Sequence, residues 1–313
     1  MLKEGVVKKP VVSVIVVTYN HRDYIKQCLD GILMQQTTFP FEIILGEDES
    51  NDGTREICID YANTYPDKIC LFLRSRKDVI YINNRPTGRF NFIENIKAAK
   101  GKYIAICEGD DYWTDPLKLQ KQVDFLEANP SYGICFHNIL QKSEFEHLKE
   151  VVIPNVNENI DFSIEDYVTS NKTATCSMVF NSNYFSPIPE WFSKLPFGDL
   201  GIILTVMKHS NKKGRVLKDI MAVYRIHSGG IHGSFHKNNK GLIKAYKQHL
   251  QFNAFITKYL LNEPEYKKVL LAKKRNAYKY LSKTYKNEKH YFLSFKYRCL
   301  MSFCKFINVI LWL

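Results

Sequence analysis

The chain has 313 residues and a formal net charge of +12, and its shares of 45% hydrophobic and 24% charged residues are typical of a globular protein with a core of normal size. The first ten residues have no apolar stretch, and no run of about 18 uncharged apolar residues occurs, so we expect neither a signal peptide nor a transmembrane helix. The eight cysteines are scattered without a CxxC pair, which argues against a zinc site and suits a reduced, cytoplasmic location.

The positive charge is concentrated in the C-terminal part of the chain. Residues 237–313 contain 17 Lys and Arg against three acidic residues, whereas the first 236 residues contain 27 basic and 29 acidic residues. The sequence therefore predicts a short lead, 1–10, a near-neutral body, 11–236, and a basic helical region, 237–313.

Two interpretations of the last stretch, 291–313, stay open. It mixes aromatic and aliphatic residues with Lys296, Arg298 and Lys305. It is compatible with an interfacial helix that makes the protein peripheral on an anionic membrane surface. It is equally compatible with an ordinary amphipathic helix that docks on the body or in a dimer, so the oligomeric state is not determined. No nucleic-acid-binding motif occurs, and we expect no nucleic-acid partner.

In the body, apolar runs typical of strands alternate with apolar patterns typical of helices. Strands are predicted over 11–20, 41–50, 68–75, 102–111 and 132–139, with a further short strand within 214–236. The stretch 174–185 is predicted to be a strand that leads into a turn. Helices are predicted over 21–36, 51–66, 90–101 and 115–130, and the stretch 195–210 is predicted to enter a helix at Gly198 and Asp199. This alternation is typical of an α/β fold with a mostly parallel, doubly wound sheet.

Polar side chains follow three of the predicted strands. They are Thr18, Tyr19 and Asn20; Glu47 and Asp48; and the run Glu108 to Asp111. In open α/β sheets the ligand lies outside the carboxyl ends of the strands, so these groups are expected to converge on one crevice. Three acids as close as Glu108, Asp110 and Asp111 repel one another and favour a bound cation. The alternative is that these acids only cap helices or face solvent.

Three segments together resemble the family 2 glycosyltransferases. They are VSVIVVTYNHRDYIKQCLDGIL, EIILGEDESNDGT and GKYIAICEGDDYW, which occur in the family's order over roughly residues 11–230. The resemblance implies a GT-A fold, with a nucleotide-binding half, 11–115, and an acceptor half, 116–236. One departure is Glu47, which stands where the family has its first Asp of the second motif.

The resemblance also implies a metal-dependent reaction with a nucleotide-sugar donor. Mg²⁺ or Mn²⁺ suits hard carboxylate oxygens and would stabilise the diphosphate leaving group. We expect Asp111 to be the main protein ligand, Asp110 to contact the ribose or the metal, and His227 to bind the metal or diphosphate. His232 and His236 are weaker candidates.

The resemblance assigns the nucleotide to the first two strand ends and to Arg225. Thr18 and Tyr19 would lie beside the base, and Asp48 would accept the ring imide N–H, which favours a UDP- or dTDP-sugar. Asn20 and Glu47 are further expected nucleotide-binding residues. Arg225 would face the phosphates.

In the acceptor half, the stretch PFGDLG places Asp199 at the start of a helix. The resemblance implies that Asp199 is the catalytic base of an inverting enzyme, and the helix N-terminus is expected to lower its pKa. The expected acceptor is a glycan or lipid-linked glycan of a bacterial surface polysaccharide.

Two alternatives remain. One is another nucleotide-using α/β enzyme, such as a nucleotidyltransferase. The absence of GxGxxG and P-loop motifs from the sequence counts against a dehydrogenase or an NTPase. The other is a catalytically silent membrane- or partner-binding protein of the same fold.

Overall fold

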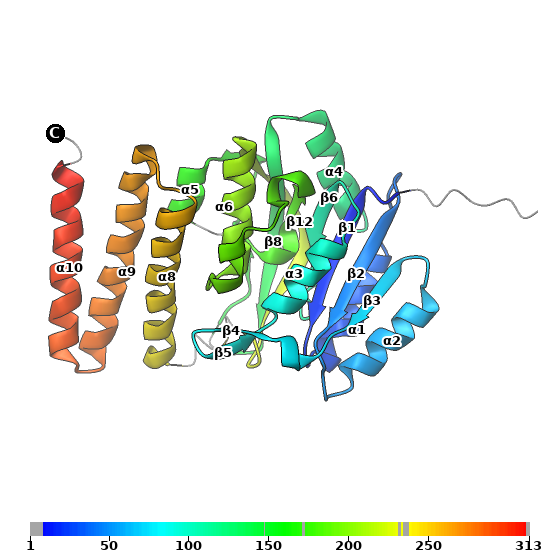
Figure 1. The fold of residues 1–313 in the computed structure, drawn as a ribbon, viewed down its shortest axis with the longest axis horizontal. Helices are drawn as coiled ribbons and strands as arrows, with labels where there is room; N and C mark the ends of the chain where they lie inside the picture. The colour runs from blue at the N-terminus through cyan, green and yellow to red at the C-terminus, as the bar shows by residue number, and fades with distance from the viewer. Residues whose placement is uncertain (1–8, 147, 171–172, 231–232, 234–237, 311–313) are drawn as a thin grey trace, which may run out of the picture.

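The computed structural model describes residues 9–146, 148–170, 173–230, 233 and 238–310. A central sheet carries helices on both faces, and three C-terminal helices stand in a row at one end of the molecule (Figure 1).

The first half of the chain confirms the predicted alternation of strands and helices. Its parallel strands lie in the order β6-β1-β2-β3. The bounds are β1 Val12–Thr18, α1 Arg22–Leu33, β2 Phe41–Glu47, α2 Thr54–Thr64, β3 Ile69–Leu73, α3 Arg89–Ala98 and β6 Tyr103–Ile106. A small hairpin of β4 Ile80–Ile82 and β5 Arg85–Thr87 precedes α3.

The second half makes the sheet mixed, because β11 lies antiparallel between β6 and β8, whereas β8 and β12 pair in parallel. The full order is β10-β12-β8-β11-β6-β1-β2-β3, with β7 on β12 and β9 on β8. The bounds are β7 Tyr112–Trp113, α4 Lys118–Ala128, β8 Tyr132–Ser143, β9 Val151–Ile153, β10 Ile160–Phe162, α5 Ile164–Thr169, β11 Val179–Asn181, α6 Gly198–Ser210 and β12 Lys213–Ile226. Within 174–185 the predicted strand is β11, and the 3-10 turn Ser182–Phe185 follows it as expected. The strand begins later than predicted, since another 3-10 turn occupies Thr175–Ser177.

Two hydrophobic cores form because alternate residues of a strand face opposite sides of the sheet. Ile15 of β1 belongs to the core under α3 and α6, whereas Val14 and Val16 belong to the core under α1 and α4. Both faces of β1 are therefore buried, which explains its uninterrupted apolar sequence.

The basic region is helical, as predicted. It consists of α8 Asn239–Tyr259, α9 Lys267–Asn287 and α10 Tyr291–Ile310. Phe252 and Ile256 of α8 enter the core of the body, α9 packs on α8, and α10 packs on α9. Among the described residues, no helix has both the length and the apolarity that crossing a bilayer requires.

Candidate active site

The polar ends of β1, β2 and β6 meet at one edge of the sheet, as their order requires. The backbone N–H of Asp48 donates to the carbonyl of Thr18 at 3.1 Å, and that of Gly109 donates to Val17 at 3.0 Å. A Cβ at position 109 would lie 2.7 Å from the Thr18 hydroxyl and 3.0 Å from the His21 ring. Glycine is therefore needed for the turn after β6 to lie against the end of β1.

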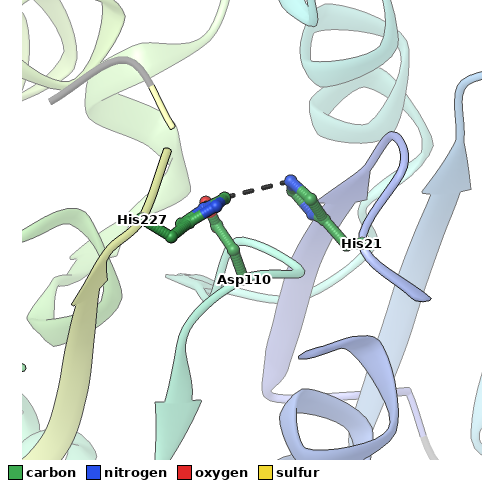
Figure 2. A group of neighbouring side chains, drawn as sticks. All are labelled: His21, Asp110 and His227. Atoms are coloured by element: carbon green, nitrogen blue, oxygen red, sulfur yellow. Dashed lines mark hydrogen bonds and ion pairs between the residues drawn. The ribbon is translucent and has the colours of Figure 1, made fainter. Parts of the chain in front are cut away.

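Three side chains point toward one another at this edge and form the best candidate metal site (Figure 2). Asp110 Oδ2 lies 3.0 Å from His227 Nε2 and 3.8 Å from His21 Nε2. Within the described part of the chain, no other group of three His, Cys, Asp or Glu brings its ligand atoms as close as the 4.8 Å seen here. Octahedral ligands at about 2.1 Å lie about 3.0 Å apart, so the Asp110–His227 pair already has metal-binding separation.

The ionisation states of Asp110 and His21 favour the binding of a cation. Burial raises the pKa of Asp110, but the hydrogen bond with His227 and the electrostatic interactions with the His21 and His227 rings outweigh it and hold that pKa below its usual value. Burial lowers the pKa of His21, with the charge of Asp110 opposing it in part, and thereby favours the neutral ring. Metal ligands must be deprotonated, so an ionised Asp110 and a neutral His21 fit that requirement.

His21 was missed by sequence reasoning, although it directly follows the strand-end residues Thr18 to Asn20. It lies in the turn before α1, where its backbone N–H donates to the Thr54 hydroxyl at 2.9 Å. His227 follows β12 directly, so the group joins the start, middle and end of the body. His232 and His236 lie outside the described residues.

Asp111 is placed apart from this group. Its side chain is buried, and its Oδ1 accepts the backbone N–H of Arg225 at 2.9 Å. Burial, followed by the charges of Asp110 and Glu108, raises its pKa well above the usual value. The carboxyl of Asp111 thus fastens the turn after β6 to β12.

Arg225 stabilises the same turn from the other side. Its Nη1 donates to the carbonyl of Asp110 at 2.5 Å, its Nη2 donates to Gln27, and the guanidinium lies 4.3 Å from the ring centre of Tyr112. This network holds the backbone of Asp110.

Two of the predicted nucleotide-binding residues, Tyr19 and Asp48, form an array with Arg76. The guanidinium of Arg76 lies 3.9 Å from the ring centre of Tyr19, and its Nη1 donates to Asp48 Oδ2 at 2.8 Å. Burial raises the pKa of Asp48 to about 6, partly offset by Arg76, while Glu47 and Glu49 raise it further. No sequence signal pointed to Arg76.

Glu47 and Asn20 hold the loops around this array. Glu47 is buried; its Oε1 accepts the Ser50 N–H at 2.7 Å and its Oε2 pairs with Arg55. Asn20, in a left-handed conformation with φ 54°, accepts the Asn51 N–H at 3.1 Å. The loops after β1 and β2 are thereby joined.

Asp199 lies in the first turn of α6, as predicted, but the expected direction of its pKa is wrong. Burial raises the pKa, and the hydrogen bond from the Leu200 N–H and the charge of Arg89 lower it only in part. The charge of Asp199 also raises the pKa of Glu108, after burial and Asp110. Electrostatics thus connect Asp199 to the acids after β6.

Arg89 is a buried cation beneath the start of α6 that the sequence did not reveal. It donates to the carbonyls of Phe192 at 3.2 Å and Leu195 at 3.1 Å. A Cβ at Gly198 would lie 2.7 Å from its guanidinium. Arg89 therefore fixes the segment that leads into Asp199.

The chain is similar to a known protein family and to individual proteins. The model of the family described as glycosyl transferase family 2 matches residues 13–185. An uncharacterized protein of Mycobacterium tuberculosis is 34% identical over 226 residues, which are 70% of this chain and 60% of that protein. The chain thus spans less than two thirds of that relative's length.

Two further similarities concern proteins whose names state an activity. The Bacillus subtilis protein TuaG, named as a teichuronic acid biosynthesis glycosyltransferase, is 33% identical over 118 residues, 38% of this chain and 42% of TuaG. A mannosyltransferase of Pyrobaculum calidifontis, solved with GDP-Man and Mn²⁺, superposes with a TM-score of 0.60 at 17% identity, over 97% of this chain and 86% of that one. The second similarity shows a shared fold.

Proposed function

Since this chain belongs to glycosyl transferase family 2, we propose that it moves a glycosyl group from a nucleotide-sugar donor to an acceptor hydroxyl. One observation carries the proposal: Asp110, His227 and His21 converge beside the array of Tyr19 and Asp48. A cation-binding group next to an aromatic ring and a carboxylate suits a diphosphate joined to a nucleoside.

The residues present fit a divalent metal. When bound, the metal would offset the negative charge that develops on the diphosphate leaving group. Two imidazoles and one carboxylate form a mixed donor set, which suits Mn²⁺ better than Mg²⁺, because Mg²⁺ prefers oxygen ligands throughout. We assign Asp110 as the carboxylate ligand in place of Asp111, because Asp110 belongs to the close group of ligand atoms and Asp111 Oδ1 already accepts the Arg225 N–H.

Asp48 is proposed to select the base. Its ionised carboxyl accepts hydrogen bonds only, so it fits a ring N–H such as that of uracil, thymine or guanine, and it disfavours adenine, which has none. Tyr19 is 37% exposed and offers a ring face beside it. Arg76 already lies on that ring, so the base would displace Arg76 or stack with it.

Asp199 is proposed as the general base. It would take the proton of the acceptor hydroxyl while that oxygen forms its bond to the anomeric carbon and the bond from this carbon to the phosphate oxygen breaks. A raised pKa makes its carboxylate a stronger base near neutral pH. A single displacement inverts the anomeric configuration. The acceptor is proposed to be a glycan or lipid-linked glycan, which the similarity to TuaG supports, since that protein is named for teichuronic acid biosynthesis.

The test is a donor screen. The purified chain is mixed with UDP-, dTDP- and GDP-sugars and Mn²⁺, Mg²⁺ or a chelator, and release of nucleoside diphosphate is followed. Asp110→Asn is the test variant. Asp67→Asn is the matched control, because Asp67 is an exposed acid just before β3, at the opposite edge of the sheet.

Metal-dependent release from one donor, lost in Asp110→Asn and kept in the control, is the expected result. Because hydrolysis without an acceptor is slow in some transferases, nucleotide binding is measured in parallel by calorimetry. If no nucleoside diphosphate binds with either metal, the proposal is refuted.

A further inference from the structure

Helix α10 is anchored to the protein by one face. Ser294 and Cys304 of that face are buried against α9. The hydroxyl of Ser282 donates to the carbonyl of Ser294, and that of Ser294 donates to the carbonyl of Ser282, each at 2.9 Å. The rings of Tyr297 and Tyr285 stack with centres 5.6 Å apart. The orientation of α10 about its own axis is therefore fixed.

The opposite face of α10 is apolar and exposed. We call it the phenylalanine face: Phe292, Phe295, Phe303 and Phe306, with exposures of 80%, 62%, 60% and 62%. At about 100° per residue these four positions fall within an arc of about 80°, so they form one stripe. Each large apolar side chain left in water forgoes the stabilisation that burial gives.

Cations flank this stripe. Lys296 lies on one side of it, and Arg298 and Lys305 lie on the other; all three are exposed. Helix α10 contains no acidic residue. Figure 1 shows α10 as the outermost element, with α9 on one side and no described element beyond it.

We propose that the phenylalanine face docks on an anionic membrane surface, with the three cations over the lipid headgroups. A helix with a stripe of Phe between Lys and Arg has the pattern that inserts at the boundary of headgroups and acyl chains. Each cation near an anionic leaflet adds attraction. A second copy of this chain fits less well, because a symmetric contact would bring the cations of two α10 helices together without acids to pair them.

The experiment is vesicle flotation with the full chain, using phosphatidylcholine alone or with added phosphatidylglycerol. The double variant Phe295→Ser/Phe303→Ser tests the stripe, and Lys296→Gln/Lys305→Gln tests the charge. The controls are Tyr81→Ser, an aromatic residue on β4 that is 64% exposed, and Lys149→Gln, an exposed lysine outside α10. All six substituted positions are exposed, and thermal melts verify folding.

We expect binding to the anionic vesicles that falls with salt. Loss of two Phe should weaken binding to them about 100-fold, at about tenfold each. Loss of two lysines should weaken it about 25-fold, at about fivefold each, and leave binding to neutral vesicles unchanged.

Three results would overturn the proposal: no flotation with anionic vesicles, equal flotation of the chain and its phenylalanine variant, or a dimer that this variant dissociates without any lipid binding. Donor hydrolysis without lipid is assayed separately, so the proposed membrane binding and the proposed transferase activity can be refuted independently.

Discussion

A methyl group at Gly46 would occupy space that two buried side chains already fill. Gly46 lies in β2, directly before Glu47 and Asp48, and Asn91 and Asn95 of α3 lie against it. Asn91 Nδ2 donates to the Gly46 carbonyl at 2.7 Å, and Asn95 Nδ2 donates to the carbonyls of Val16 and Ile44 at 3.0 and 3.3 Å. A Cβ at position 46 would lie 1.9 Å from Asn91 Oδ1 and 2.6 Å from Asn95 Nδ2.

Gly46→Ala therefore forces both amides to move. Overpacking of a buried site costs about 1–3 kcal/mol. Hydrogen bonds of two buried amides are lost or lengthened, at about 1 kcal/mol for each side chain. The free energy of unfolding should fall by about 3–5 kcal/mol, a large part of the stability of an ordinary domain. Nucleotide binding should weaken too, because α3 supports β2, which leads directly into Asp48.

The assay is urea unfolding followed by tryptophan fluorescence, with Gly88→Ala as the matched control. Gly88 precedes α3, and a Cβ there meets no atom within 4 Å. The control should change stability by less than about 1 kcal/mol. If the free energy of unfolding of Gly46→Ala is within about 1 kcal/mol of that of the unchanged chain, Asn91 and Asn95 do not hold β2 as described.

Three further outcomes follow from the site. Asp199→Asn should lower turnover about 10²–10⁴-fold and leave donor affinity unchanged in calorimetry; equal losses in both would point to a binding role. Nucleotide affinity should weaken as pH falls through about 6, because protonation removes the acceptor on Asp48; a titration that is flat across this range contradicts the assignment. Asp110→Asn should weaken Mn²⁺ binding at least about tenfold and more than Asp111→Asn does, as calorimetry without donor would show; the reverse order would restore Asp111 as the ligand.

The strand ends were predictable from the sequence because apolar runs that stop at polar residues mark where a parallel strand leaves the core. The position of Asp110 relative to Asp111 was not predictable. These two residues are adjacent, and the turn at Gly109 and the Arg225 N–H decide which carboxyl faces His227. A local pattern cannot specify an orientation that a strand about 115 residues later imposes.

The direction of the Asp199 pKa shift could not be predicted from the local sequence either. The sequence revealed the helix N-terminus, which favours the charged form, but burial depends on elements distant along the chain. Arg76 and Arg89 were missed for a related reason. Each is one basic residue among many in the sequence, and only the fold places its guanidinium against Tyr19 or beneath α6.

The turn after β1 has a thermodynamic consequence. Asn20, which is hydrogen-bonded to the loop that carries Ser50 and Asn51, is followed directly by His21 of the candidate metal group. A nucleotide and a metal would therefore order the same few residues, and whichever binds first bears most of that entropic penalty. Each should then increase the affinity for the other by the same factor, because coupling between two bound ligands is reciprocal. A site of this kind is tightest when nucleotide and cation are present together.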